Sequence, residues 1–360
     1  MKYLIIGGVA GGATVAARLR RNDETAEIVL FERGEYVSYA NCGLPYYIGE
    51  TISSRDALFV QTVEGFRSRY NIDIRVKSEV ERIEPDKKLI HVYNIEKGSR
   101  YTESYDKLIL SPGAEPVKPK IEGINHPGIF TLRNVPDTDR IKKFVTVKDI
   151  ERAIVVGAGF IGLEMAENLH NLGFEIDVVE MADQVMSHLD LSMATIIHSQ
   201  LRAKGVSLHL SDAVAKFEER GNKIGVILKS GKELEGEIVI WSIGVKPETK
   251  LAKEAGLEIG VTGGIKVNEF MQTSDKDIYA LGDAVEVINP VLNKPALIPL
   301  AGPANKQGRI VADNIVYGNL AKYEGSIGTG IAKVFDLTVA STGASGRWLK
   351  REGIDYISSY

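Results

Sequence analysis

The chain repeats one pattern of strand, glycine turn, helix and acidic strand end, and this duplication constrains its fold more than any other feature. The first copy has the turn Gly7–Gly12 and ends its second strand at Glu32. The second copy has the turn Gly157–Gly162 and ends at Glu180. A β-branched strand that leads through a glycine turn into a helix is typical of a nucleotide-binding βαβ unit. The pattern predicts strands over residues 4–6, 28–31, 154–156 and 176–179, and helices over 13–20 and 163–172.

Each copy continues into alternating polar and apolar residues, which predict β-hairpins, and then into a closing strand with a turn. We therefore expect an α/β protein with a discontinuous first domain over 1–118 and 245–322 and a second domain over 119–244. Residues 323–360 are too few for a core of their own and should pack on another part of the chain. Further strands are expected over 72–83, 108–110, 223–229, 238–240, 278–281 and 330–342, turns at Pro85-Asp86 and Ser230-Gly231, and a short helix near 346–351.

The second copy carries a complete dinucleotide fingerprint. Gly157, Gly159 and Gly162 have the Gly-x-Gly-x-x-Gly spacing, and Glu180 follows the last glycine by eighteen residues. Such a turn directs backbone N–H groups and the positive end of a helix at a pyrophosphate, and the acidic residue accepts from a ribose hydroxyl. A carboxylate there would repel a 2′-phosphate, and no arginine or lysine lies within 181–188. We therefore expect NADH rather than NADPH at this copy.

The first copy departs from the fingerprint, because Val9 stands where the second glycine belongs. Gly7, Gly12 and Glu32 keep their places. Two dinucleotide sites in one chain indicate two different cofactors that exchange electrons, since a simple dehydrogenase would need only one.

Composition excludes several classes of protein. The charge balance, 44 basic against 48 acidic side chains with a net charge of -4, gives no electrostatic footprint for nucleic acid or an anionic membrane. Only one cysteine is present, so this chain forms no internal disulfide, Cys-x-x-Cys pair or all-cysteine metal site, and a reducing, cytoplasmic compartment is favoured. The six histidines show no ligand spacing, so no metal is expected. The uncharged stretch 3–17 is too short to span a bilayer, and although it superficially resembles a signal peptide, its glycine pattern fits a phosphate loop better.

The lone cysteine lies in the run Asn41-Cys42-Gly43-Leu44-Pro45. We interpret Asn41 as a helix cap with Cys42 in the first turn, where Pro45 is tolerated because early helical N–H groups have no partner within the helix. The positive end of the helix should lower the pKa of the thiol and make Cys42 a nucleophile at neutral pH. The alternative is a small buried hydrophobic residue, the usual fate of a lone cysteine.

These features together resemble the flavin-dependent pyridine nucleotide-disulfide oxidoreductases, in the single-cysteine branch that holds coenzyme A-disulfide reductases, NADH-dependent persulfide reductases and NADH oxidases or peroxidases. The resemblance covers nearly the whole chain and includes the Asn41-Cys42-Gly43 turn, Gly157 to Glu164, the Gly282-Asp283 turn and residues 300–305. It implies two Rossmann-like domains of the glutathione reductase type and a partial C-terminal α+β interface domain. The family's interface domain is longer and supplies a homodimer contact, so a chain that stops at Tyr360 leaves dimerisation open.

The resemblance also implies site residues. The first copy would hold FAD through Gly7, Gly8, Val9, Ala10, Gly11, Gly12, Glu32, Gly113, Gly282, Asp283 and Ala301. The second would hold NADH through Gly157, Gly159, Phe160, Ile161, Gly162, Glu180 and Gly244, with Phe160 covering the flavin until the nicotinamide arrives. Cys42 and Asn41 would be catalytic, and Thr14, Arg18, Arg21, Ser38 and Asn305 would line the thiol-substrate site.

Two details favour coenzyme A disulfide, or a coenzyme A persulfide or polysulfide, over oxygen or peroxide as the substrate. Peroxidases of this branch have a histidine where this chain has Ala10, and usually a serine where it has Asn41. Arg18 and Arg21 are cations that suit coenzyme A phosphates, and the alternative for both is a solvated helix face. The alternatives are an NADH oxidase or peroxidase with a cysteine sulfenic acid, and a flavin-bearing redox sensor without sustained turnover.

Overall fold

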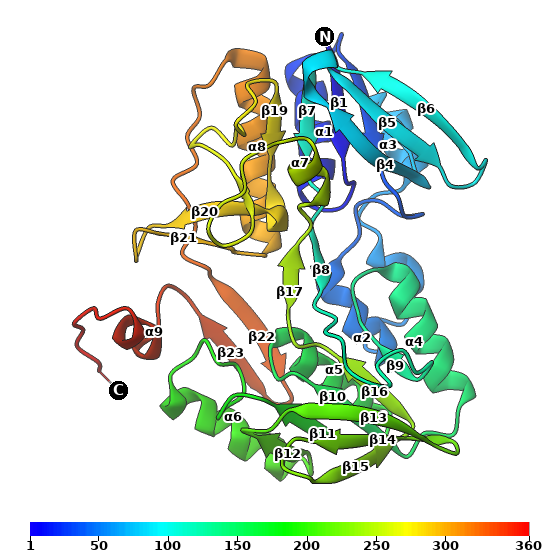
Figure 1. Ribbon diagram of the computed structural model, residues 1–360, viewed down its shortest axis with the longest axis vertical. Helices are drawn as coiled ribbons and strands as arrows, with labels where there is room; N and C mark the ends of the chain where they lie inside the picture. Colours follow the sequence, from blue (N-terminus) through cyan, green and yellow to red (C-terminus); the bar gives the residue numbers. More distant parts are fainter. Residues whose placement is uncertain (360) are drawn as a thin grey trace. The chain divides into compact units, whose positions relative to one another are not determined.

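The computed structural model describes residues 1–359, which divide into two compact units (Figure 1). The chain passes between the units five times, and two of these passages fall within the short strands β8 (Ala114–Pro116) and β17 (Val245–Pro247). The first unit comprises residues 1–39, 59–115 and 246–328, and the second comprises residues 40–58, 116–245 and, of the described residues, 329–359. The segment that carries Cys42 therefore belongs to the second unit.

The first unit is built on a five-stranded sheet in the order β19-β7-β1-β2-β3, with all neighbours parallel. Its central strand is buried from Tyr3 to Ile6, as expected for a parallel sheet covered on both faces. Three-stranded sheets β4-β5-β6 and β18-β20-β21 complete the strands of this unit. The bounds are β1 Lys2–Ile6, β2 Glu27–Phe31, β3 Asp73–Arg75, β4 Ser78–Glu84, β5 Leu89–Asn94, β6 Ser99–Ser104, β7 Lys107–Leu110, β18 Ile265–Lys266, β19 Ile278–Ala280, β20 Val285–Asn289 and β21 Lys294–Ala296.

Helix α1 follows the first glycine turn and packs against α8, the longest helix of the first unit. The two helices approach closely, since a Cβ at Gly308 would lie 3.0 Å from the carbonyl oxygen of Gly11. Helix α3 is capped by Thr62, whose side chain accepts from Gly65 N, and ends at Asn71 in the left-handed conformation that favours asparagine. The helices of this unit are α1 Gly11–Asn22, α3 Val63–Tyr70, α7 Lys250–Glu254 and α8 Ala301–Tyr317.

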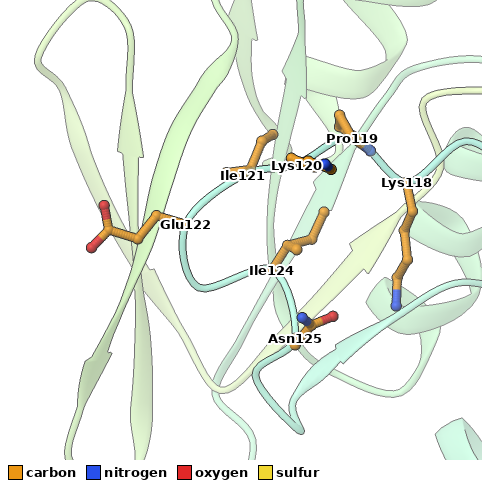
Figure 2. A pocket seen from close by; sticks show the side chains of 7 residues that line it. All are labelled: Lys118, Pro119, Lys120, Ile121, Glu122, Ile124 and Asn125. Atoms are coloured by element: carbon orange, nitrogen blue, oxygen red, sulfur yellow. The ribbon is translucent and has the colours of Figure 1, made fainter.

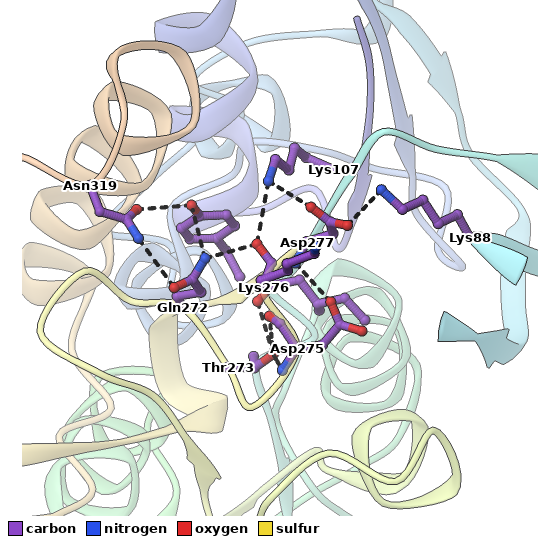
Figure 3. Close-up of polar contacts among 10 residues, drawn as sticks. Lys88, Lys107, Gln272, Thr273, Asp275, Lys276, Asp277 and Asn319 are labelled. Carbon is purple, nitrogen blue, oxygen red and sulfur yellow. Dashed lines mark hydrogen bonds and ion pairs between the residues drawn. The ribbon is translucent and has the colours of Figure 1, made fainter. Parts of the chain in front are cut away.

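A buried carboxylate fixes the edge strand of the first sheet (Figure 3). Asp277, just before β19, accepts from Lys107 Nζ at 2.7 Å and pairs with Lys88 Nζ at 2.5 Å. Burial opposes its ionisation, but the two lysines outweigh burial and lower the pKa of Asp277. Before Asp277 on the same segment, Gln272 Oε1 accepts at 3.1 Å from Asn319 Nδ2, which lies just after α8. The edge strand, the β4–β6 hairpins and α8 are thus joined by polar contacts within one unit.

The second unit has a matching sheet in the order β12-β11-β10-β16-β9, again parallel throughout. The equivalent of β1 is β10, which pairs with β11 on one side and with β16 on the other. Sheets β13-β14-β15 and β22-β23 complete the strands. The bounds are β9 Ile129–Phe130, β10 Arg152–Val156, β11 Glu175–Glu180, β12 Ser207–Leu210, β13 Val214–Arg220, β14 Lys223–Leu228, β15 Glu233–Gly236, β16 Ile238–Trp241, β22 Gly330–Val334 and β23 Leu337–Ser341.

The helices of the second unit include α5, which follows the second glycine turn, and α4, whose cap Asn134 accepts from Asp137 N. The C-terminal segment packs within this unit: Phe335 N donates to Glu167 Oε2 at 2.8 Å, and Gly346 N donates to Asp190 Oδ2 at 3.0 Å. The bounds are α2 Leu44–Ile48, α4 Val135–Val147, α5 Phe160–Asn171, α6 Leu191–Ala203 and α9 Gly346–Arg351.

The α/β class with two Rossmann-like sheets is confirmed. The predicted β-pattern of residues 330–342 forms β22 and β23, and the short helix 346–351 is α9. Among residues 1–359, no helix has the length and apolar character needed to cross a membrane.

Candidate functional site

The first glycine turn lies between β1 and α1 and needs glycine at two positions. Gly7 has a positive φ of 95°, and a Cβ there would lie 2.1 Å from the carbonyl oxygen of Ser111. A Cβ at Gly12 would lie 1.9 Å from the carbonyl oxygen of Gly7. Gly8 and Gly11 are also tightly surrounded, by Leu30 and Leu281 at 2.8 and 2.6 Å from an added Cβ. The turn is therefore fixed by close packing, and Val9 and Ala10 occupy the two positions before α1 begins.

Glu32 supports this turn from the end of β2. Its carboxylate accepts from Gly8 N at 2.9 Å and from Gly34 N at 2.8 Å. A carboxylate has about four acceptor positions, so capacity remains for a ribose hydroxyl. Glu32 therefore lies directly after β2 with its carboxylate against the glycine turn.

The second turn repeats these features. Gly157 has a φ of 100°, and an added Cβ would lie 2.4 Å from the carbonyl oxygen of Ser242; at Gly162 the distance to the carbonyl oxygen of Gly157 would be 1.9 Å. Glu180 accepts from Ala158 N at 2.7 Å and from Ala182 N at 2.8 Å. The two carboxylates thus bind equivalent backbone groups in the two copies.

The second turn differs at Gly159, the residue before α5. No heavy atom lies within 4 Å of a Cβ added there, so this position is open. Phe160 and Ile161 form the first turn of α5, and the Phe160 ring lies 5.0 Å from the His188 ring. Both α1 and α5 lack a capping side chain at their starts. The first N–H groups of each helix, which have no partner within the helix, are available to an anionic ligand.

This arrangement fits dinucleotides at both copies. Each copy combines a turn that excludes side chains, an uncapped helix start and an acidic strand end, which are the parts that a pyrophosphate and a ribose require. Gly113 and Gly244, with φ values of 76° and 126°, follow the closing strands and have no atom within 4 Å of an added Cβ. These residues would hold FAD in the first unit and a nicotinamide dinucleotide in the second.

Three further residues predicted for the flavin lie at the end of β19 and the start of α8. Gly282 N donates to Gln307 Oε1 at 2.8 Å, and Asp283 follows in a short 3₁₀ turn. Ala301 is the first residue of α8. Gln307 is buried and orients the Gly282 turn, a role that nothing in its sequence position signalled.

The predicted thiol-substrate residues fall in the first unit. Thr14 Oγ1 donates to Asn305 Oδ1 at 2.8 Å, so these two lie together between α1 and α8. Arg18 is engaged by both oxygens of Asp313, at 2.8 and 3.1 Å. Arg21 lies over the Tyr70 ring at 5.6 Å from its centroid, and Ser38 N donates to Gly8 O at 2.9 Å.

Cys42 lies in a 3₁₀ turn, Asn41–Gly43, directly before α2, and its thiol is exposed. The prediction that Asn41 caps this helix is wrong: Ala40 is the residue before the turn, and no side chain caps it. Pro45 lies at the start of α2, as expected. The alternative of a buried hydrophobic cysteine is excluded by the exposed thiol.

The prediction that the pKa of the Cys42 thiol is lowered is also wrong. Partial desolvation and the nearby charge of Glu164 both raise the pKa of Cys42, and its backbone N–H offsets this only in part. The α2 helix has five residues and follows the cysteine, so its dipole is too small to dominate.

Glu164 and Tyr46 are site residues that the sequence reasoning missed. Tyr46 Oη donates to Glu164 Oε1 at 3.4 Å. Burial raises the pKa of Glu164 to about 7; the Tyr46 hydrogen bond lowers it in part, and Glu167 raises it further. Burial and Glu164 raise the pKa of Tyr46 to about 12. The spacing of Cys42 and Tyr46 at i, i+4 was an available signal for Tyr46, whereas only the packing of α2 on α5 identifies Glu164.

One cation near the second site comes from far along the chain. Arg347 pairs with Asp183 at 2.9 Å and donates to Gln184 Oε1 at 2.6 Å. It thus reaches the segment after Glu180, which has no arginine or lysine of its own, and Asp183 balances its charge.

A pocket of 480 Å³ lies elsewhere in the second unit, along the loop after β8 (Figure 2). None of the predicted site residues lines it; Lys118, Pro119, Lys120, Ile121, Glu122, Ile124 and Asn125 do. Within residues 1–359, no group of three or more His, Cys, Asp or Glu side chains is arranged to hold a metal ion.

Comparison with known proteins gives a consistent result. Residues 1–308 match the family model described as pyridine nucleotide-disulphide oxidoreductase. The coenzyme A disulfide reductase of Staphylococcus haemolyticus (strain JCSC1435) is 34% identical over 342 residues, which are 95% of this chain and 76% of that protein.

Two solved structures share the fold closely. The reduced Bacillus anthracis CoADR-RHD has a TM-score of 0.96 and 52% identity, over 98% of this chain and 63% of that one. The NAD-dependent persulfide reductase from A. fulgidus has a TM-score of 0.95 and 40% identity, over 99% of this chain and 66% of that one. The chain thus spans less than two thirds of the length of either solved chain.

Proposed function

Because the chain belongs to the pyridine nucleotide-disulphide oxidoreductase family, we propose that it uses NADH to reduce coenzyme A disulfide, or a coenzyme A persulfide or polysulfide, through the thiol of Cys42. The observation that carries the proposal is the exposed thiol of the chain's single cysteine, in the same unit as the open second glycine turn. Relatives named for these activities support the choice of substrate. An exposed free thiol also favours the reducing cytoplasm as the compartment.

Each of the two cofactors is assigned to one glycine turn. FAD would be held in the first unit by the Gly7–Gly12 turn, Glu32 and the Gly282-Asp283 turn, and NADH in the second by the Gly157–Gly162 turn and Glu180. Bound flavin would supply the two-electron link between NADH and sulfur. Glu180 supports NADH over NADPH, because its carboxylate would repel a 2′-phosphate and Arg347 is already paired with Asp183.

The chain's own residues would perform the sulfur chemistry. The Cys42 thiolate attacks one sulfur of the substrate disulfide, forming a mixed disulfide and releasing one coenzyme A thiol. Two electrons then break that bond, returning the Cys42 thiolate and releasing the second thiol. The overall reaction consumes NADH, one proton and the disulfide, and yields NAD⁺ and two thiols. With a persulfide, the products are one thiol and one sulfide.

The partner residues of the thiol substrate are proposed from the first unit. Thr14 and Asn305, which hydrogen-bond each other, together with Ser38 and Arg21, would contact the coenzyme A moiety. Arg18 already donates two hydrogen bonds to the Asp313 carboxylate. It would bind a coenzyme A phosphate with its remaining donors while it keeps this ion pair.

The test is a count of thiols. The full chain is reduced anaerobically with one equivalent of NADH and then mixed with coenzyme A disulfide or persulfide. We expect two thiols per NADH from the disulfide, one thiol and one sulfide from the persulfide, and none from Cys42→Ser with either substrate.

Two outcomes would overturn this proposal. Hydrogen peroxide that oxidises the reduced protein faster than both sulfur substrates would indicate a peroxidase with a cysteine sulfenic acid. Failure to consume NADH beyond one turnover with any substrate would indicate a redox sensor.

A further inference from the structure

The segment after Glu180 is fastened to the second glycine turn through Ala158. The Glu180 carboxylate accepts from Ala158 N at 2.7 Å and from Ala182 N at 2.8 Å. Met186 N donates to the carbonyl oxygen of Ala158 at 2.9 Å. Both backbone groups of Ala158 are therefore bound from residues 180–186, and Asp183, the first acidic residue after Glu180, stands in this segment. Its charge lies in the segment whose first carboxylate would bind a ribose.

Helix α9 is fastened to the same segment at its first two residues. Gly346 N and Arg347 N donate to the Asp190 carboxylate at 3.0 and 2.6 Å. The side chain of Ser345 caps the helix by accepting from Trp348 N. The backbone of Arg347 is therefore fixed beside residues 183–190, although 157 positions of sequence separate it from Asp190.

The guanidinium group of Arg347 is held by two side chains of this segment. Its Nη1 and Nη2 atoms each donate to Asp183 Oδ1 at 2.9 Å, and Nη1 also donates to Gln184 Oε1 at 2.6 Å. Gln184 is fully buried, and its Nε2 donates to the carbonyl oxygen of Leu189 at 3.0 Å, which orients Oε1 toward Arg347. A guanidinium has about five N–H donors, so about two remain for a ligand.

Asp183 differs from Glu180 and Asp190 in what it binds. Those two carboxylates accept from backbone N–H groups and so shape the segment. Within residues 1–359, the hydrogen bonds of Asp183 all come from Arg347, and its side chain is 58% exposed. The carboxylate of Asp183 therefore supplies a negative charge beside the Arg347 guanidinium rather than support for the backbone.

Resting on the proposed function, we propose that Asp183 is a specificity-determining residue, which makes the second glycine turn select NADH over NADPH by balancing the charge of Arg347. A phosphate monoester carries between about one and two negative charges near neutral pH. An arginine near the acidic strand end is the residue that accommodates a 2′-phosphate in dinucleotide sites. With Asp183 present, a 2′-phosphate would meet an ion pair; without it, the phosphate would meet an unbalanced cation.

The carboxylates of Glu180 and Asp183 thus act on different groups. Glu180 would accept from a ribose hydroxyl and repel a phosphate in its place, whereas Asp183 removes an attraction that Arg347 would otherwise exert. Residues 181–190 contain no arginine or lysine, so this cation reaches the segment only through the tertiary fold. Because the ion pair is exposed, its influence on a ligand is screened by salt and is expected to be modest.

The test measures the binding of two adenine nucleotides that differ only at the 2′-position. ADP-ribose and 2′-phospho-ADP-ribose lack the nicotinamide and cannot reduce a flavin, so isothermal titration calorimetry of the full chain at low ionic strength reports equilibrium binding alone. In Asp183→Asn we expect the affinity for 2′-phospho-ADP-ribose to rise about fivefold, and the affinity for ADP-ribose to stay within about twofold. In Asp183→Asn/Arg347→Gln the gain should disappear, because the cation that produces it is absent.

The matched control is Asp336→Asn, which removes another exposed carboxylate of the second unit, paired with Lys204 at 2.7 Å. This substitution changes the net charge of the chain by the same amount and should leave both affinities unchanged. Urea unfolding verifies that each variant is folded. Arg347→Ala replaces Arg347→Gln in the double variant if the latter does not fold.

Three results would overturn the proposal. The first is an unchanged affinity of Asp183→Asn for 2′-phospho-ADP-ribose. The second is a gain that persists in the double variant, because Asp183 would then act by direct repulsion without Arg347. The third is an equal gain in Asp336→Asn, which would reflect the overall charge of the chain.

These measurements separate the role of Asp183 from the proposed function, since neither nucleotide contains sulfur. A fivefold gain without release of coenzyme A thiols would retain the role of Asp183 and reject the proposed substrate. Normal thiol release with NADH and no gain would retain the proposed function and reject the role of Asp183. A wild-type chain that binds neither nucleotide would overturn both, because the second glycine turn would then hold no dinucleotide.

Discussion

The two glycine turns have the same backbone but different surroundings. Both need glycine where φ is positive, and both place a glutamate across two backbone N–H groups. The turns differ at their third residue, which is Val9 in the first copy and Gly159 in the second, where no heavy atom lies within 4 Å of an added Cβ. The backbone of the second turn can therefore be approached closely at a place where the first turn carries an isopropyl group. The duplication thus preserves the turn and its carboxylate and varies the side chain that a bound pyrophosphate meets.

The two sheets also differ in the origin of their edge strands. In the second unit the edge strand β9 precedes the glycine turn, whereas in the first unit β19 comes from residues that follow the entire second copy. The first unit therefore depends on long-range contacts to complete its sheet, among them the Asp277 ion pairs.

The largest expected effect is a loss of stability at a tightly packed glycine of the second turn, Gly157, in contrast to the open glycine Gly159. Gly157→Ala forces a Cβ into a left-handed residue 2.4 Å from a carbonyl oxygen, so it should cost at least about 3 kcal/mol of stability. Gly159→Ala should leave the free energy of unfolding unchanged and weaken only NADH binding. Urea unfolding and NADH titration of both variants test this. Equal destabilisation by the two substitutions would remove the distinction between a packed and an open position.

The next effect tests the edge strand of the first unit. Asp277→Asn should cost about 1–3 kcal/mol, because Lys88 and Lys107 lose a buried partner. Since its folded pKa is lowered, Asp277 contributes stability above its unfolded pKa, and that stability is lost as the pH falls through the folded pKa. Unfolding measured from pH 7 to pH 3 should therefore show a smaller acid-induced loss in the variant. Glu269→Gln, which removes an exposed pair with Lys322 at 3.6 Å, is the control and should keep the wild-type slope.

A smaller effect compares the two carboxylates. Glu180→Gln should weaken NADH about tenfold, equivalent to about 1.4 kcal/mol, and leave flavin content unchanged, whereas Glu32→Gln should reduce flavin content and leave NADH affinity unchanged. Flavin absorbance per chain and NADH titration give both quantities. If either substitution altered both cofactors equally, the assignment of one cofactor to each copy would be wrong.

The smallest effect concerns the C-terminal segment, which packs in the second unit. Arg347→Ala removes an exposed ion pair with Asp183 and a partly buried hydrogen bond to Gln184, and should cost about 1 kcal/mol. Limited proteolysis should nevertheless release the segment after residue 329 faster. Arg351→Ala, which removes an ion pair with the neighbouring Glu352, should behave as the wild type; equal protection of all three chains would show that Arg347 does not hold the segment.

Much of the fold could be predicted because its elements are specified locally. The glycine turns require backbone conformations that only glycine adopts easily, and β1, β10, α5 and α9 lie where the residue patterns place them, within a few positions. The acidic strand ends were predicted for the same reason, since Glu32 and Glu180 act on residues of their own turn.

The parts that could not be predicted depend on contacts between distant segments. Asn41 has the residue type of a cap, yet the chain turns so that Ala40 precedes the helix and no side chain caps it. The thiol pKa was predicted to be lowered by a helix dipole, but burial raises it, and the charge of Glu164 on α5, which packs on α2, raises it further. Gln307 and Arg347 likewise reach the site only through the tertiary fold.

The late origin of β19 has a consequence for biosynthesis. A ribosome that has released residues up to Trp241 has delivered every strand of the second unit's parallel sheet, while the first unit still lacks the strand that ends at Ala280. The nascent chain therefore carries an N-terminal sheet in which β7 still lacks its partner β19 throughout the synthesis of the inserted copy, and translation pauses in this interval prolong the exposure of that edge to aggregation.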